Sequence, residues 1–330
     1  MLKFILKRLL VTIPVLLGVI LIIFILMSLT EGDPALMMLG DMATPEEIEA
    51  LRDELGLNNP FHIRYFSYVW DVIRGDLGVS YATREPVFEV VMSRLPATFR
   101  LSLFSCLFAI LIGVPMGIIS AVKQYSFTDN LTRVLALLGI AMPNFWLALM
   151  LVLFFSVALG WLPPSGLYGP AYYILPSISI SAVSLATFAR MTRSSMLEVI
   201  RQDYIRTARA KGQKESIIVF RHALHNALIP IIAVVGLQFA VVLGGAVVNE
   251  QIFAIPGIGN LMVSAIRARD FPVVQGAVLV IAVLFCLLNL FVDLLYSFVD
   301  PRIKSQYTKA GRKKKSVPVA APAEVKEVQA

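Results

Sequence analysis

The sequence predicts an all-α, polytopic membrane protein with six transmembrane helices, both termini in the cytoplasm, and a helical extracytoplasmic cap between the first two spans. Three observations support this prediction. Hydrophobic residues make up 58% of the 330-residue chain, and its mean hydropathy is +0.77. Apolar runs long enough to cross a bilayer recur along the chain. Lysines and arginines gather in alternate connecting segments. A soluble domain of this length could not bury so much apolar surface.

Six spans are expected where apolar runs approach the roughly 20 residues that a helix needs to cross about 30 Å of hydrocarbon. The first occupies residues 9–30, after a short cytoplasmic N-terminus at 1–8, and the other five lie within a core at 99–301. The core spans are placed at about 101–122, 134–160, 172–192, 227–249 and 273–299. The fourth is short and rich in serine, which suggests a helix that faces other helices rather than lipid.

The distribution of positive charge sets the orientation of these spans. Lysine and arginine outnumber aspartate and glutamate by 29 to 22. The basic residues gather before the first span, between spans two and three, in a loop at 193–226, and in a tail at 302–330. With six spans, all four segments lie on one side, which the positive-inside rule identifies as the cytoplasm. Topology therefore explains the charge, and no nucleic-acid partner is expected. The tail lacks helical periodicity and is expected to be disordered.

The segment at 31–98 is too long for a simple connection and carries its own helix signals. Thr44–Glu47 reads Thr-Pro-Glu-Glu, a capping box with proline at the first helical position, and Gly56 is placed to end that helix. A second helix is expected after Pro60 and a third after Pro86. Together these signals predict a small helical cap that lies on the outer surface of the membrane.

A charge-rich stretch in the loop at 193–226 predicts a short amphipathic helix. Leu197, Ile200, Tyr204 and Ala208 recur at helical spacing with arginines between them, and Gly212 is expected to end the helix in a left-handed conformation. One interpretation is a basic loop that lies on anionic lipid. We favour a helix that docks in a groove of a partner protein, because the apolar stripe is narrow and the chain returns directly into a span.

This stretch, which reads DYIRTARAKG at 203–212, resembles the EAA coupling loop of ABC-importer permeases, most closely that of the oligopeptide/dipeptide/nickel group. The wider family has Glu-Ala-Ala where this chain has Arg206, Thr207 and Ala208, so Ala208 matches, as does Gly212. The motifs TIPVLLGVI, LGLNNP, RGDLGVSY and RLPATFRLSL also follow the order found in this group, in its subunit type with a long first outer loop. The resemblance extends over residues 1–302.

The resemblance implies the type I ABC importer permease fold and a role as a membrane-spanning subunit of an ATP-driven, binding-protein-dependent importer. The expected location is a prokaryotic cytoplasmic (inner) membrane. Di- and oligopeptides are the expected cargo, and a nickel chelate, glutathione or an oligosaccharide are the alternatives within the family. The implied partners are a second, homologous permease subunit, two cytoplasmic ATP-binding subunits, an extracytoplasmic substrate-binding protein and the lipid bilayer.

The resemblance also assigns contact with the ATPase subunits to the amphipathic helix and its glycine. The residues implied are Asp203, Tyr204, Arg206, Thr207, Ala208, Arg209 and Gly212. Motion of the ATPase subunits would pass through them to the fifth span. Because ATP and Mg would be bound by those partner subunits, no cofactor is expected in this chain.

Polar residues inside the apolar spans are the remaining candidates for function, because they are costly in a bilayer. Gln238 and Asn249 in span five, and Asn289 and Asp293 in span six, are candidate lining residues of a substrate pathway. For Asn289 and Asp293, a contact that packs helices together is the stronger interpretation.

The chain is not expected to be an enzyme. Its sequence contains no GxxxxGK[ST] phosphate-binding loop, no histidine within a span and no cluster of metal-ligand residues. Neither ATP hydrolysis, intramembrane proteolysis nor a metal site is therefore predicted. A secondary transporter or channel that works without ATP is the alternative from another class. Such proteins usually place charged groups at mid-membrane, where these spans carry almost none.

Overall fold

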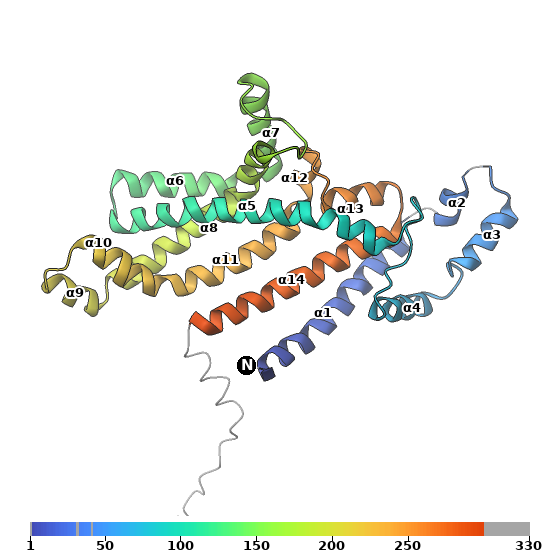
Figure 1. The fold of residues 1–330 in the computed structure, drawn as a ribbon, viewed down its shortest axis with the longest axis horizontal. Coiled ribbons are helices and arrows are strands. Elements are labelled where there is room, and N and C mark those ends of the chain that lie inside the picture. The colour runs from blue at the N-terminus through green and yellow to red at the C-terminus, as the bar shows by residue number, and fades with distance from the viewer. Residues whose placement is uncertain (1, 31–32, 41, 300–330) are drawn as a thin grey trace, which may run out of the picture.

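The computed structural model describes residues 2–30, 33–40 and 42–299, and these ranges are mainly helical. Figure 1 shows an elongated arrangement of long helices that run in the same general direction. They are α1 (Leu2–Leu29), α5 (Val87–Val122), α8 (Ile174–Ile200), α11 (His225–Gly245) and α14 (Phe271–Val299). Five helical segments of the described chain are long and apolar enough to cross a membrane, and a bent pair makes a sixth if it forms one span. The predicted all-α membrane architecture is confirmed.

The bent pair replaces the straight third span that the sequence predicts at 134–160. The chain forms α6 (Phe127–Ala141), α7 (Asn144–Leu151) and the π-helical turn η1 (Val152–Ala158), and it bends by 104° between α6 and α7. Met142 is extended at the bend, with ψ of 128°, and Pro143 follows it. Proline disfavours a helical conformation in the preceding residue and has no backbone N–H to continue the helix, which explains the break.

Helices α5 and α8 pack so closely that only glycine fits between their backbones. A β-carbon at Gly117 would lie 2.5 Å from the carbonyl oxygen of Ala189, and one at Gly113 would lie 2.7 Å from that of Leu185. Small residues permit such close approach of membrane helices. The serines of α8 that the sequence directs toward other helices are buried: Ser177, Ser179, Ser181 and Ser184.

A carboxylate joins three helices at the cytoplasmic end of this core. Asp129, in the first turn of α6, is fully covered by its neighbours and accepts two hydrogen bonds from the Arg193 guanidinium of α8, at 2.8 and 3.0 Å. The Ser120 hydroxyl of α5 donates a third at 2.5 Å, and the backbone amide of Tyr125 donates a fourth at 2.9 Å. This network holds α5, α6 and α8 together close to the cytoplasmic loop.

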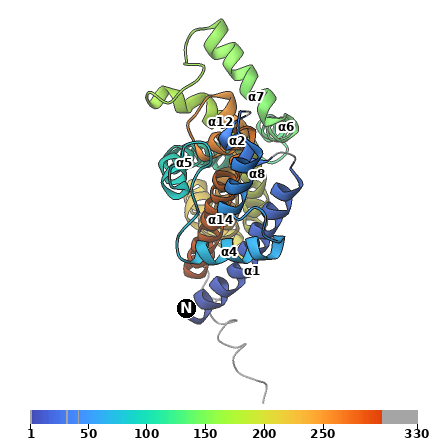
Figure 2. The ribbon, with the colours of Figure 1, turned by 90° about the vertical axis from the view of Figure 1, so that its right-hand side faces the viewer.

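Three short helices precede α5: α2 (Pro34–Leu39), α3 (Pro45–Glu54) and α4 (Phe61–Ile73). The capping box that the sequence predicts is present at the start of α3, where Glu47 accepts a hydrogen bond from the Thr44 backbone amide at 2.8 Å. Figure 2 shows α4 crossing α1. In Figure 1, α2 and α3 lie farther from the long helices than α4 does. The cap is therefore made of α2 to α4.

The expected third cap helix after Pro86 is not a separate element. It continues through Pro96 into the second span as the single helix α5, so the predicted cap boundary at residue 98 falls inside a helix. Val87 and Val91, near the start of α5, are fully buried in the same core cluster as the first turns of α14. That burial explains why the first turns of α5 stay helical despite the proline.

Short elements connect the long helices at both ends. On the outer side these are η2 (Pro170–Tyr173), α12 (Val247–Ile252) and α13 (Ile258–Arg267), and on the cytoplasmic side they are α9 (Asp203–Ala210), α10 (Glu215–Ile217) and η3 (Ile218–Leu224). The helices extend beyond the predicted spans: α1 begins within the N-terminal segment 1–8, α8 passes residue 192, and the fifth span is helical from Glu215. Charged residues indicate where a span leaves the membrane, but the helix can continue beyond that point. The predicted tail at 302–330 lies outside the described residues.

Candidate coupling site and outer loop

Helix α9 is attached to the cytoplasmic ends of the long helices by one buried side chain. Ile205 has no exposed surface and packs in a cluster with Ile118 of α5, Met196 of α8 and Ile218 of η3. Gln202 before it is extended, with ψ of 150°, so the chain changes direction between α8 and α9. A displacement of α9 would therefore act directly on α5, α8 and the beginning of the fifth span.

The apolar stripe that the sequence predicts for this helix is partly wrong. Leu197 and Ile200 belong to the end of α8, and Tyr204 is 44% exposed. Helical spacing places all of these residues on one face only if the helix is continuous, and the extended residue Gln202 interrupts it. The inward-facing residues of α9 are Ile205 and, in part, Ala208. Sequence reasoning missed Ile205, although its position three residues before Ala208 is a signal for a shared face.

Other predicted coupling residues lie on the exposed side of α9. The side chains of Asp203 and Arg206 are 98% and 76% exposed, and their ion pair is long, at 3.8 Å. Thr207 is also exposed, and its hydroxyl donates to the Asp203 carbonyl of the preceding turn. An exposed pair of this kind contributes little to folding. These side chains are therefore accessible for contact with another protein.

Side-chain contacts also fix α9 to the segment that continues into α11. Arg209 donates to the Glu215 carboxylate of α10 at 2.7 and 3.3 Å, and Asn226 of α11 donates to the Tyr204 hydroxyl at 3.0 Å. Between them Gly212 adopts φ of 73°, which confirms the predicted left-handed turn. Because a β-carbon there would meet open space, glycine is required by the backbone conformation rather than by packing.

The structure places the four polar pathway candidates at separate positions. Asn249 is buried in α12 and accepts a hydrogen bond from Ser179 of α8 at 2.7 Å. Asn289 donates to a carbonyl of its own helix at 3.0 Å, and Asp293 pairs with Arg8 of α1 at 2.9 Å. Each of the three thus has a partner within the chain, and its place in a substrate pathway stays a prediction. Gln238, half-buried on α11, stays a candidate for the pathway.

Sequence reasoning missed a fully buried acid on the outer side, Glu250 of α12. Its carboxylate accepts hydrogen bonds from the Thr98 hydroxyl of α5 at 2.6 Å and from the Asn260 backbone amide of α13 at 2.9 Å. The Thr98 oxygen in turn accepts from the Ile258 amide at 2.8 Å. Burial raises the pKa of the Glu250 carboxyl, although these hydrogen bonds oppose the shift. The carboxylate thus fastens the loop between α12 and α13 to α5.

Protonation of Glu250 is expected to stabilise the protein. Because its folded-state pKa lies above the ordinary value of 4.5, the stability it contributes is fully present below that pH. This contribution is lost as the pH rises through the folded-state pKa. Glu250→Gln imitates the protonated acid, so the variant should not show this loss. Unfolding midpoints of the wild type and of Glu250→Gln, measured as the pH is raised from 4.5, test the prediction. Identical pH profiles of the two proteins would contradict it.

The motifs and elements described above agree with a known family of membrane proteins. The family model of the binding-protein-dependent transport system inner membrane component matches residues 113–305, more than half of the chain. The chain belongs to this family. A second model, for the N-terminal region of such membrane components, matches residues 1–102. The protein is therefore an inner membrane component of a transport system, as the sequence resemblance predicts.

Named relatives of this inner membrane component match it over nearly its whole length. It is 46% identical to the dipeptide transport system permease protein DppB of Alkalihalophilus pseudofirmus, over 92% of this chain and 100% of that protein. Identity is 44% to a putative peptide transport system permease protein of Brucella abortus, over 91% and 98% of the two chains. Identity is 43% to the glutathione transport system permease protein GsiC of Salmonella typhimurium, over 92% of this chain and 99% of that protein.

A solved structure supports the fold. A chain of the inward-facing MetNI methionine ABC transporter matches this component with a TM-score of 0.55 and 19% identity, covering 64% of this chain and 96% of that chain. At this identity the match concerns the fold alone. The fold is that of an ABC importer permease, which confirms the predicted class.

Proposed function

We propose that this inner membrane component is the permease subunit of an ATP-driven importer that carries di- and oligopeptides into the cytoplasm. The observation that supports this most strongly is the 46% identity to a dipeptide permease along nearly the entire chain. The related glutathione permease falls in the same chemical class, because glutathione is itself a short peptide. Peptide cargo accounts for both relatives.

The chain works with other proteins and catalyses no reaction itself. A binding protein delivers the peptide from outside, a second, homologous permease subunit completes the membrane pathway, and two cytoplasmic subunits bind ATP with Mg. The exposed, charged side of α9 fits a groove on one of these ATPase subunits, because a short amphipathic helix presents a compact, rigid surface. Asp203, Arg206 and Thr207 make this contact.

Coupling in this proposal is mechanical. Closure of the ATPase subunits on ATP displaces α9, and Ile205 passes the displacement to α5, α8 and η3, with which it shares a cluster. The long helices then shift between an outward-facing and an inward-facing arrangement, so that ATP binding changes the populations of two states. Gln238 on α11 contributes to the pathway that this shift opens.

Uptake by the reconstituted transporter tests the proposal. The chain, its partner permease subunit and the ATPase subunits are inserted into liposomes, and a labelled dipeptide is supplied with the binding protein. We expect accumulation of the dipeptide that requires both ATP inside and the binding protein outside. Accumulation without ATP, or transport of other solutes but no peptide, would contradict the proposal.

A further inference from the structure

Helix α4 of the cap has three faces with different surroundings. The first packs against α1 and the adjoining core, through Tyr65, Tyr68, Val69 and Val72. The Tyr65 hydroxyl donates to the Leu17 carbonyl of α1 at 3.1 Å, and the Tyr68 ring lies 5.4 Å from that of Phe24. Figure 2 shows the two helices crossing. This face fixes the position of α4 relative to the first span.

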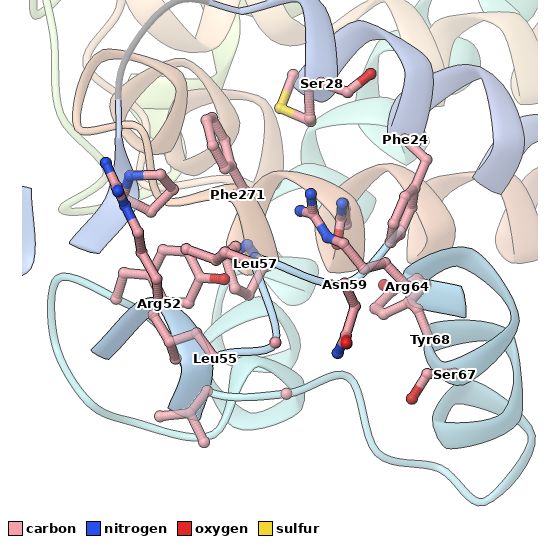
Figure 3. A pocket seen from close by; sticks show the side chains of 18 of the residues that line it. Phe24, Ser28, Arg52, Leu55, Leu57, Asn59, Arg64, Ser67, Tyr68 and Phe271 are labelled. Carbon is pink, nitrogen blue, oxygen red and sulfur yellow. The ribbon is translucent and has the colours of Figure 1, made fainter. Parts of the chain in front are cut away.

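The second face of α4 is polar and borders a pocket. Arg64, Ser67 and Asp71 recur at helical spacing and, with Tyr68, line a cavity of about 720 Å³ between α4, the end of α3 and the beginning of α14. Figure 3 shows Arg64, Ser67 and Tyr68 on the side of α4 that borders this cavity, with Phe24 and Phe271 nearby. Arg64 and Asp71 thus lie on the side of α4 that borders the pocket.

The third face is apolar and exposed. Ile63, Phe66, Trp70 and Ile73 recur every three or four residues, so they share one side of the helix. Their exposed fractions are 48%, 67%, 55% and 70%, and Ile63, at the edge of the stripe, also lines the pocket. The Arg74 guanidinium lies 4.9 Å from the centre of the Trp70 ring at the end of this stripe. Four large exposed apolar side chains in a row mark a surface that contacts something apolar.

The contacts with α1 show how deep this stripe lies. The pair between Arg8 and Asp293 marks the cytoplasmic ends of α1 and α14. At 1.5 Å per residue, Leu17 is about 14 Å and Phe24 about 24 Å from Arg8 along α1. Both distances fall within a hydrocarbon core of about 30 Å. Tilt of α1 would place the two residues farther from the outer surface of the membrane. On α14 the same scale places Phe271 about 33 Å from Asp293, near the outer boundary.

We propose that α4 is immersed in the outer leaflet of the bilayer, with Phe66, Trp70 and Ile73 in contact with lipid acyl chains and Ile63 at the border between lipid and the pocket. Arg64, Ser67 and Asp71 then face water in the pocket, at the level where α14 begins. Lipid is the occupant because the contacts of α4 with α1 lie at acyl-chain depth, and because Arg64 and Asp71 line the pocket, while the Arg74 guanidinium lies at the end of the stripe. The sequence predicts a cap that lies on the membrane surface. In this proposal α4 instead anchors the cap in the membrane.

Two adjacent residues provide a matched test. Phe66 and Ser67 are both exposed in the chain but belong to the apolar and the polar face. Phe66→Cys and Ser67→Cys are made with Cys106→Ala and Cys286→Ala, and the assembled transporter in membranes is treated from outside with an impermeant maleimide. We expect the thiol of Ser67→Cys to react at least tenfold faster than that of Phe66→Cys, because the thiol at position 66 lies in lipid. Labelling after denaturation shows that both thiols are intact. Comparable rates in the membrane would overturn the proposal.

A second measurement distinguishes lipid from a partner protein. With Trp146→Phe and Trp161→Phe, Trp70 is the remaining tryptophan, since the chain contains three. The assembled transporter and a matched transporter that also carries Trp70→Phe are placed in bilayers whose phospholipids carry bromine on the acyl chains, and the difference in emission between them reports Trp70. We expect at least a twofold loss of Trp70 emission relative to unbrominated lipid. Unchanged emission, with Phe66→Cys still protected, would show that a protein covers the stripe and would overturn the proposal.

Discussion

Replacing Ile205 by alanine is expected to abolish ATP-driven uptake while the transporter remains assembled. Removing a fully buried branched side chain costs about 2–5 kcal/mol, and here the loss falls on the attachment of α9. Helix α9 has 8 residues, too few for a stable helix without tertiary packing. The loosened helix would still reach the ATPase subunits through its exposed side but would not move the long helices. Uptake in proteoliposomes should fall at least tenfold.

The matched control is Ile217→Ala. Ile217 lies in the same cytoplasmic segment, on α10, but is 41% exposed. The same change of side chain there should leave uptake within about twofold of wild type, because little buried contact is lost. Recovery of the ATPase subunits with the purified complex checks assembly in both variants. Wild-type uptake by an assembled Ile205→Ala transporter would show that this attachment does not transmit the motion.

Replacing Asp129 by alanine is expected to produce the largest loss of stability at the cytoplasmic end. The change removes the acceptor of four hydrogen bonds and leaves the Arg193 guanidinium, 21% exposed, without its carboxylate. Breaking a buried ion pair by removing one partner costs about 3–5 kcal/mol. Because the Arg193 partner is partly exposed, solvent screens the pair, and we expect about 2–3 kcal/mol. The unfolding midpoint of the purified chain should fall accordingly.

An exposed acid provides the control for this variant. Asp203 pairs with Arg206 at 3.8 Å, and both side chains are open to solvent. Asp203→Ala should leave the unfolding midpoint almost unchanged, since exposed pairs contribute little. The two aspartates lie in the same cytoplasmic region, so a general effect of removing a negative charge would appear in both. Equal midpoints for the two variants would contradict the role assigned to Asp129.

The membrane architecture could be predicted from the sequence because its causes are local. Apolar runs identify spans, and basic residues identify their cytoplasmic ends, without reference to any distant contact. The capping box at Thr44 and the left-handed turn at Gly212 were likewise predictable, because each depends on residues within one turn of chain. Family membership followed from motifs read in order along the chain.

What could not be predicted depends on contacts between distant residues. Glu250 is held by Thr98, 152 residues away, so its importance was not visible in its own segment. Pro143 marks a break, but the 104° bend also depends on packing of α7 against α8 and α12. The attachment through Ile205 was missed because α8 ends at Ile200 and α9 begins after Gln202 without a glycine or proline to signal the break. The exposed face of α4 was read as surface because sequence gives no depth for a connecting segment.

The most direct test of the coupling proposal is photo-crosslinking from the exposed side of α9. A photoreactive amino acid is placed at Arg206, whose side chain is 76% exposed, and the assembled transporter is irradiated in native membranes. The proposal predicts a covalent product with a cytoplasmic ATP-binding subunit, with a yield that changes when ATP is added. A product with the extracytoplasmic binding protein, or the absence of any product with an ATPase subunit in an active transporter, would contradict it.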